Sequence, residues 1–316
     1  YRVEEVFSII VTTYNTDLNK IFLTLNSILA QDYKKIELLI ADDGSRENHF
    51  SEIETYFQER EFHNYKLVSD GINRGTVENF FRALKIATGK YVKAIGGGDL
   101  LFDEKTLSSV FKVMNKKKSR IAFGNMQTYR KNQNNVWEFD TYIGPADIKA
   151  YIKGKEKRIK KNVIVFGKFI SGAGLFFERK TLEKLLDGIR GSIIYCEDLV
   201  QVLFLLENIQ IDYIPRNVIW YELGEGISSG VSSKGNVLLK KDYDNLLQYL
   251  KEHYKQDKNV KRLLLRKACD RYSKCLRGGI KILVVPGMFI TDIKTRYQEK
   301  QGLYCAQNKI GFLNKI

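Results

Sequence analysis

The segment that decides the fold is FSIIVTTYNTD, which runs from Phe7 to Asp17. The largely apolar stretch Phe7–Thr12 has the length of a buried strand, and the polar sequence TTYN follows it directly. Asp17 then offers a helix start, because aspartate is a favoured N-cap residue. An amphipathic helix is predicted next, from the helical spacing of Ile21, Leu25, Ile28 and Leu29. The chain therefore opens with a strand, a polar loop and a helix.

This strand–helix alternation continues for more than a hundred residues. Further strands are predicted at residues 36–41, 65–68 and 91–95. The intervening helices are marked by Ile53 and Phe57, by Val77, Phe80, Phe81 and Leu84, and by Leu107, Val110, Phe111 and Met114. Alternation with short connections predicts an α/β fold, a mostly parallel sheet covered by helices on both faces. Right-handed crossovers then bring the loops after the strands to one edge, where ligands of open α/β sheets bind.

Three polar clusters follow the predicted strands and are expected to meet at that edge: Thr12-Thr-Tyr14-Asn15, Asp42-Asp43-Gly-Ser45 and Gly96-Gly97-Gly98-Asp99. The glycines allow the backbone to approach a bulky charged ligand. Asp99, directly after them, suits Mg²⁺ or Mn²⁺, which prefer oxygen ligands and often share phosphates. The simpler readings are an Asp-Gly turn at Asp43 and a capped helix start after Asn15.

Two segments of the middle region complete the candidate site. Phe169–Phe177 reads as a strand with a close backbone approach at its glycines. Glu197 and Asp198 precede a predicted helix that carries Leu199, Val202, Leu203 and Leu206. Two adjacent acids there could divide the work of a general base, one orienting and one accepting a proton. The alternative is a helix start favoured by the dipole.

Several common site types are absent from the sequence. No GxGxxG or GxxxxGK[ST] motif follows the first strand, and the histidines His49, His63 and His253 are scattered. The four cysteines form no CxxC pair, which favours reduced thiols and a cytoplasmic location. No apolar run reaches the length of a membrane-spanning helix.

The last quarter of the chain is strongly basic. Residues 236–316 contain 18 Lys and Arg against 7 Asp and Glu, and the whole chain carries a net charge of +15. We therefore expect two parts, a catalytic domain at 1–235 and a basic helical region at 236–316. Such a charge excess favours an anionic partner, and a membrane surface is one candidate. Nucleic acid is not expected, because no RRM, KH or zinc-finger motif occurs.

Taken in order, several segments resemble inverting family-2 glycosyltransferases of the GT-A fold, and among them bacterial enzymes that build capsule or other surface polysaccharide. The matching segments are Ser8–Asn15, Ser27–Gln31, Ile40–Ser45, Ala87–Tyr91, Gly97–Asp99, Ser171–Gly174, Glu197-Asp198 and Trp220–Ser229.

The resemblance implies a UDP-sugar donor and a saccharide or lipid-linked saccharide acceptor. The basic carboxyl-terminal helices favour a peripheral position on the inner face of the plasma membrane, and the simpler readings of these helices are a solvated charged face or an oligomer contact. It assigns the nucleotide to Thr12, Tyr14, Asn15, Asp42, Asp43, Arg74, Gly97 and Gly98. It assigns Mn²⁺ or Mg²⁺ to Asp99, and the catalytic base to Asp198 with Glu197 beside it. A metal-dependent nucleotidyltransferase and a non-catalytic nucleic-acid- or membrane-binding protein remain the alternatives, and an oligomer is left open.

The chain departs from the family pattern at three places. Gly96 and Gly98 stand where acids are common, which weakens the expected ribose contact and metal site. A histidine that many members carry in the stretch 221–226 is absent, and a water or Glu225 is expected to take its place. The QxxRW motif of processive members does not follow Asp198, which favours the addition of a single sugar.

Overall fold

A single mixed sheet organises the protein. The computed structural model describes residues 5–131, 137–223, 233–271, 283, 285–304 and 310–316. Its nine strands follow the order β3-β2-β1-β4-β8-β6-β9-β5, with β7 paired to β6. The strands are β1 (Phe7–Thr13), β2 (Ile36–Asp42), β3 (Tyr65–Val68), β4 (Tyr91–Gly96), β5 (Leu100–Leu101), β6 (Ile121–Lys131), β7 (Trp137–Ile143), β8 (Leu175–Glu178) and β9 (Ile211–Glu222).

The parallel half of the sheet brings the polar strand ends together, as predicted. Strand β1 pairs in parallel with β2 and β4, and β2 pairs in parallel with β3. In this register Thr12 lies opposite Gly96 on one side, and Thr13 lies opposite Asp42 on the other. The three polar clusters therefore share one edge of the sheet.

Helices cover both faces because residues of the central strands alternate in direction. Ile9 and Val11 of β1 face a core formed with α1, α2 and α4, whereas Ile10 faces a core formed with α3, α7 and α8. The helices of this part are α1 (Leu18–Leu29), α2 (Phe50–Glu59), α3 (Thr76–Ile86), α4 (Thr106–Lys117), α5 (Ile148–Ile152), α6 (Glu156–Lys160), α7 (Arg179–Ile189) and α8 (Gln201–Leu206). A π-helix, Lys161–Val165, follows α6.

The second half of the sheet is mixed and corrects one prediction. Strand β8 runs antiparallel to both β4 and β6, while β6 and β9 are parallel. The strand predicted for Phe169–Phe177 begins only at Leu175, because Gly172–Gly174 form a 3-10 turn. The glycines let this segment turn towards the carboxyl edge of the sheet rather than continue the strand.

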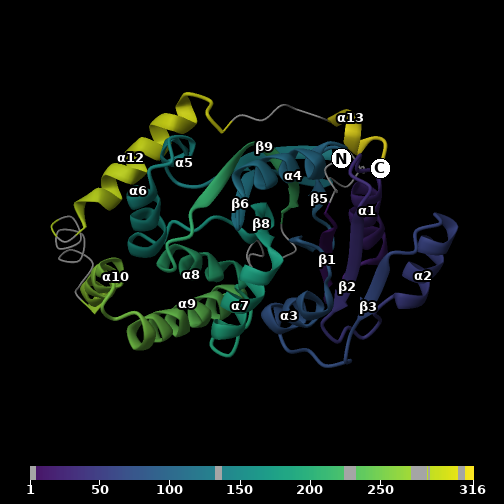
Figure 1. Ribbon diagram of the computed structural model, residues 1–316, viewed down its shortest axis with the longest axis horizontal. Coiled ribbons are helices and arrows are strands. Elements are labelled where there is room, and N and C mark those ends of the chain that lie inside the picture. The colour runs from purple at the N-terminus through teal and green to yellow at the C-terminus, as the bar shows by residue number, and fades with distance from the viewer. Residues whose placement is uncertain (1–4, 132–136, 224–232, 272–282, 284, 305–309) are drawn as a thin grey trace.

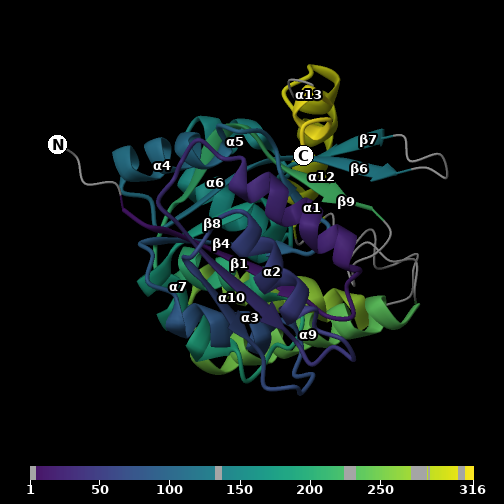
Figure 2. The ribbon, with the colours of Figure 1, turned by 90° about the vertical axis from the view of Figure 1, so that its right-hand side faces the viewer.

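The carboxyl-terminal part is helical, as predicted, where it is described. It contains α9 (Ser233–His253), α10 (Lys258–Ala268), α12 (Pro286–Lys300) and α13 (Ile310–Leu313). Figure 1 shows these helices arching around the sheet, with α9 near α7 and α12 beside α5 and α6. The chain returns to the first helix at its end, where Asn26 Nδ2 donates a 3.0 Å hydrogen bond to the carbonyl of Ile316. Figure 2 shows β6 and β7 projecting together from one side of the molecule. None of the described helices is long and apolar enough to cross a membrane.

Candidate active site

A cleft of about 870 Å³ opens where β1 and β4 end. Its wall is completed by the end of β9, the turn at residues 169–173, the segment 195–199 and one side of α9. The predicted site residues among its lining are Thr12, Tyr14, Asn15, Gly97, Asp99, Glu197 and Asp198. The fold thus gathers into one space residues that are nearly two hundred positions apart.

The loop after β1 presents an exposed aromatic ring at the mouth of this cleft. Tyr14 is 52% exposed, so its face is available for stacking. Asn15 adopts a left-handed conformation with φ of 48°, and its N–H donates a 2.7 Å hydrogen bond to Ser45 Oγ. Asn15 Oδ1 accepts the N–H of Arg46 at 3.0 Å. Asn15 therefore joins the loops after β1 and β2 and holds Tyr14 beside them.

The carboxylates of Asp42 and Asp43 accept hydrogen bonds from neighbouring loops, and neither residue is among the described residues that line the cleft. Asp42 is buried and accepts hydrogen bonds from Thr13 Oγ1 at 3.0 Å and from the N–H of Ser45 at 2.9 Å. Asp43 accepts the N–H groups of Arg74 and Gly75, both at 2.9 Å. Burial raises the pKa of Asp43, against the effect of these two bonds. A carboxylate has further lone pairs, so nucleotide binding by Asp43 stays a prediction.

Arg74 and Gly98 also lie outside the described lining. The Arg74 guanidinium is half-exposed and pairs with Asp70 at 2.9 Å, so it reaches the nucleotide only if it leaves that partner. Gly98 has φ of 111°, a conformation that side chains disfavour.

Asp99 contributes a carboxylate to the cleft lining, directly after the three glycines that begin at the end of β4. Its Oδ1 accepts the backbone N–H of Glu222 at 3.0 Å, and both residues line the cleft. Burial raises the pKa of Asp99 to about 7; the N–H of Glu222 and the charge of Lys93 oppose this rise, and the Glu222 carboxylate adds to it. Carboxylate oxygens are the ligands that Mg²⁺ and Mn²⁺ prefer, so the donor set at Asp99 fits such a cation.

Glu197 and Asp198 line the same cleft and lie in a 3-10 turn at Glu197–Val200 that leads into α8. Asp198 Oδ2 accepts the N–H of Gly172 at 3.2 Å. Burial raises the pKa of both carboxyl groups, the Asp198 charge raises the pKa of Glu197 further, and the Asp242 charge raises the pKa of both. These two acids face the cleft with a higher proton affinity than ordinary carboxylates, which suits a base that works near neutral pH.

The sequence of residues 8–186 matches the family model of glycosyl transferase family 2. The chain belongs to this family. The match includes β1, β2, β4 and the Gly97–Asp99 segment, and it ends before Glu197.

Two curated relatives of this family 2 protein come from bacteria. It is 23% identical over 137 residues to the glycosyltransferase GlyG of Streptococcus pneumoniae serotype 4, which is 43% of this chain and 44% of the relative. It is 29% identical over 127 residues to WfgD of Escherichia coli, named as a UDP-Glc:alpha-D-GlcNAc-diphosphoundecaprenol beta-1,3-glucosyltransferase, which is 40% of this chain and 47% of the relative. The matches thus span less than half the length of these relatives.

Solved structures share the fold over nearly the whole chain. Staphylococcus aureus TarS 1–349 in complex with UDP superposes with a TM-score of 0.53 at 16% identity, over 94% of this chain and 92% of the other. The mannosyltransferase PcManGT of Pyrobaculum calidifontis, in complex with GDP-Man and Mn²⁺, has a TM-score of 0.54 at 17% identity, over 94% and 87%. These matches confirm the predicted GT-A fold.

A buried lysine of this family 2 protein escaped the sequence analysis. Lys93 lies in the middle of β4 with no exposed surface, and its Nζ donates 2.6 Å hydrogen bonds to the carbonyls of Ala94 and Ala173. Burial lowers its pKa to about 7, and the charges of Asp99 and Glu197 oppose that shift. The one signal in the sequence was a charged residue inside an otherwise apolar strand, Tyr91–Ile95.

The carboxyl-terminal region contributes directly to the cleft of this family 2 protein. Leu239 and Tyr243 of α9 are among its lining residues. Asp242, between them, is buried and holds the backbone just before Glu197. The boundary between residues 235 and 236 stays a prediction, but α9 begins at Ser233 and is part of the site wall.

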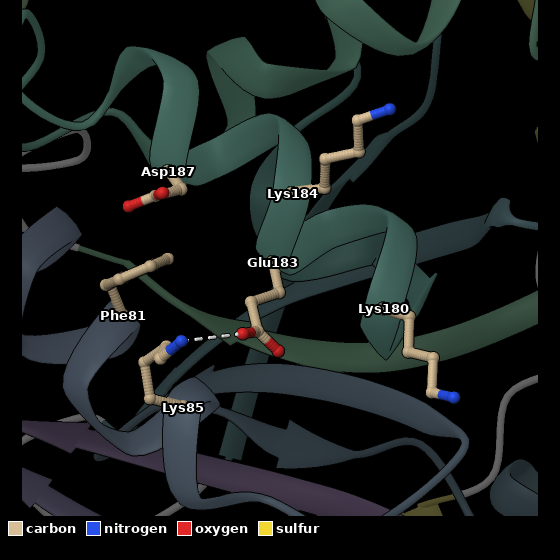
Figure 3. A pocket seen from close by; sticks show the side chains of 6 residues that line it. All are labelled: Phe81, Lys85, Lys180, Glu183, Lys184 and Asp187. Carbon is tan, nitrogen blue, oxygen red and sulfur yellow. Dashed lines mark hydrogen bonds and ion pairs between the residues drawn. The ribbon is translucent and has the colours of Figure 1, made fainter.

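Two other hollows lie away from this chemistry. Figure 3 shows the smaller one, about 250 Å³, between α3 and α7, where Lys85 and Glu183 pair at 2.9 Å. This hollow is open to solvent, and the positively and negatively charged side chains that line it lie beside one another. The larger hollow, about 750 Å³, lies between α6, the end of α8 and α10. The lining of neither hollow includes residues of the cleft, so we place the functional site at the cleft.

Proposed function

We propose that this protein transfers one sugar from a UDP-sugar to an acceptor hydroxyl with inversion at the anomeric carbon. The observation that carries the proposal is that one cleft is lined both by Asp99 and by Asp198. The first suits the diphosphate side of a donor, and the second suits an acceptor. The family to which the chain belongs and its fold are consistent with this division.

In the proposed reaction the acceptor oxygen attacks the anomeric carbon directly. Asp198 takes the proton of the acceptor hydroxyl as the new C–O bond forms, and the bond to the diphosphate breaks with its electron pair on UDP. One displacement inverts the configuration, and no protein nucleophile is needed. General-base catalysis supplies about 10²–10⁴-fold, so positioning and charge stabilisation in the cleft must supply the remainder.

A divalent cation at Asp99 would neutralise charge that develops on the departing diphosphate. The residues of this chain would hold the two ends of the donor. Tyr14 would stack on the base at the cleft mouth, and Gly97 permits close backbone approach at the floor. Thr12, whose Oγ1 lies 3.5 Å from the carbonyl of Ile95, retains hydrogen-bonding capacity for the base.

A panel of nucleotide sugars tests this function. We expect a UDP-sugar to raise the melting temperature in the presence of Mn²⁺ or Mg²⁺, and to be hydrolysed slowly with release of UDP. Stabilisation by GDP- or dTDP-sugars alone would contradict the nucleotide assignment. A nucleotidyltransferase, the alternative enzyme, would instead release inorganic diphosphate from a nucleoside triphosphate and a sugar phosphate.

We further propose that the acceptor is a lipid-linked saccharide of cell-surface polysaccharide synthesis, met at an anionic membrane surface. The name of WfgD specifies a diphosphoundecaprenol-linked acceptor for that relative. In this chain α12 exposes one apolar stripe, Ile290, Ile293 and Tyr297, with exposed fractions of 50%, 68% and 60%. Lys294 and Lys300 are exposed on the same helix, and Lys149 Nζ lies 5.9 Å from the Tyr297 ring centroid. An apolar stripe with a basic rim is typical of a helix that lies on an anionic membrane.

Vesicle flotation tests the membrane proposal. The full chain is expected to float with phosphatidylglycerol vesicles and to bind phosphatidylcholine vesicles weakly. Ile290→Glu combined with Ile293→Glu is expected to abolish flotation, whereas Ile86→Glu, at a site 45% exposed on α3, leaves it unchanged. Equal flotation of the double variant would contradict the assignment to α12.

A further inference from the structure

Gly98 has φ of 111°, which favours glycine, and the end of another side chain fills the space beside it. A Cβ built at position 98 would overlap Glu222 Oε2. Glu222 is the last residue of β9, and its carboxylate therefore occupies the space that a side chain on residue 98 would take. The family commonly has acids at the positions of Gly96 and Gly98. This chain has no acid at position 98, but the Glu222 carboxylate lies where a side chain at that position would begin.

The structure fixes Glu222 in this position through several contacts. Its N–H donates the 3.0 Å hydrogen bond to Asp99 Oδ1, and its carboxylate lies beside the neighbouring Gly98. It lies opposite Tyr129 in the parallel register of β6 and β9, and the Tyr129 hydroxyl donates to the carbonyl of Gly98. The N–H of Leu223 donates to the carbonyl of Tyr129 at 3.0 Å. Hydrogen bonds thus join the Gly98–Asp99 turn both to β6, through Tyr129, and to the end of β9, through Glu222.

A cation already pairs with Glu222. Lys20 Nζ of α1 lies 2.9 Å from Glu222 Oε1, and both side chains are only partly exposed, 27% and 18%. Both line the cleft together with Asp99. The Glu222 carboxylate therefore points to a place in the cleft where positive charge is accommodated.

We propose that Glu222 is a ligand of the divalent cation of this site, shared with Asp99, and that it replaces the acid missing at position 98. Two carboxylates supply hard oxygen ligands, the rest of the coordination shell being left to the donor diphosphate and water. Lys20 balances the Glu222 charge when no metal is bound and releases it when the cation enters. This inference rests on the proposed function, because the metal it invokes serves a nucleotide diphosphate.

Mn²⁺ binding to the full chain tests the inference without turnover. Free aquo-Mn²⁺ is followed by electron paramagnetic resonance during titration, in the presence of saturating UDP. We expect Glu222→Gln to weaken Mn²⁺ binding at least about tenfold, the lower end of losses seen even for outer-shell partners. Glu222→His, which restores a metal-ligating side chain, is expected to recover most of the affinity for Mn²⁺ and less of that for Mg²⁺, which binds nitrogen poorly.

Lys20→Met separates a ligand from a mere ion-pair partner. If Glu222 binds the metal, removing the competing ammonium leaves Mn²⁺ affinity unchanged or raises it. If Glu222 serves only to hold Lys20, then Lys20→Met and Glu222→Gln will weaken Mn²⁺ binding alike, and the inference is overturned. Glu183→Gln, in the hollow of Figure 3, is the matched control and should bind Mn²⁺ as the wild type does.

Further measurements distinguish failure of the metal assignment from failure of the proposed function. UDP affinity in EDTA shows whether each variant keeps its fold and its nucleotide site. Transfer by the wild type together with unchanged Mn²⁺ affinity in Glu222→Gln would overturn the metal assignment alone. Mn²⁺ binding that depends on Glu222 without any sugar transfer would overturn the reaction and leave the metal site standing.

Discussion

The buried carboxylate of Asp242 accepts the backbone N–H of Cys196 at 2.9 Å, directly before the acidic pair Glu197-Asp198. The same carboxylate accepts the N–H groups of Ile194 at 3.0 Å and Tyr195 at 2.6 Å. Three consecutive N–H groups on one anion make a rigid support. Helix α9 thus fixes the backbone from which the proposed base projects.

Asp242→Asn should therefore impair turnover without removing a group that touches substrate. An amide has one acceptor oxygen, so at least one of the three N–H groups loses its partner and the turn before Glu197 loosens. We expect kcat to fall about tenfold to a hundredfold, the scale of small misplacements in a site, with little change in donor KM. Asp244→Asn, exposed on the same helix, is the control.

The pH profile provides a second readout of the Asp242 variant. The charge of Asp242 raises the pKa of both Glu197 and Asp198, so its neutralisation should move the acid limb of kcat to lower pH. A fall in kcat that is equal at every pH would leave the positioning role standing and would exclude an effect of the Asp242 charge on the pKa of the acidic pair.

Asp198→Asn is expected to lower kcat by about 10² to 10⁴-fold, the usual contribution of a general base. Binding of UDP, measured by calorimetry, should change little, because in the proposed reaction Asp198 contacts the acceptor hydroxyl and not the nucleotide. Glu197→Gln, which alters the neighbouring acid, should cost less than Asp198→Asn. Near-normal turnover of Asp198→Asn would show that another group takes the proton.

The wild-type pH dependence follows from the environment of Asp198. Burial raises its pKa above the ordinary value of 3.8, and the bond from Gly172 opposes that rise. A base must be ionised to act, so kcat should be full above the raised pKa and should fall as the pH drops through it. We expect the midpoint of this acid limb well above pH 4, measured at saturating donor and acceptor, and a midpoint near 4 would contradict a buried base.

Site residues that follow directly from a local sequence pattern could be predicted, whereas residues whose role depends on contacts between distant parts of the chain could not. The strand ends at Thr12 and Asp99 could be placed because parallel strands share one edge. Glu222 meets Asp99 across 123 positions, and Asp242 meets Cys196 across 46. No periodic pattern in the sequence indicates that such distant residues are in contact. The turn at Gly172 was mistaken for a strand because its apolar neighbours Phe169 and Phe177 fit both readings.

Lys93→Met tests the buried lysine through stability. The pKa of Lys93 falls from 10.5 to about 7 on folding, so between these values the unfolded chain binds more protons than the folded one. This group therefore makes stability rise with pH across that window. We expect the free energy of unfolding of the wild type, relative to Lys93→Met, to increase from pH 7 to pH 10 in urea titrations. A constant difference would mean that Lys93 stays fully charged in the folded protein.

Gly172→Ala tests the packing of the acidic pair. A Cβ at this position would lie 2.7 Å from Glu197 Oε1 and 3.1 Å from Asp198 Cβ, so both side chains must shift for it to fit. We expect kcat to fall by about tenfold or more, while the melting temperature changes by only a few degrees. Gly191→Ala is the matched control, because a Cβ there meets no described atom within 4 Å, and it should retain full activity. Equal activity of the two variants would show that Glu197 and Asp198 tolerate displacement, which is incompatible with a base held in place for in-line attack.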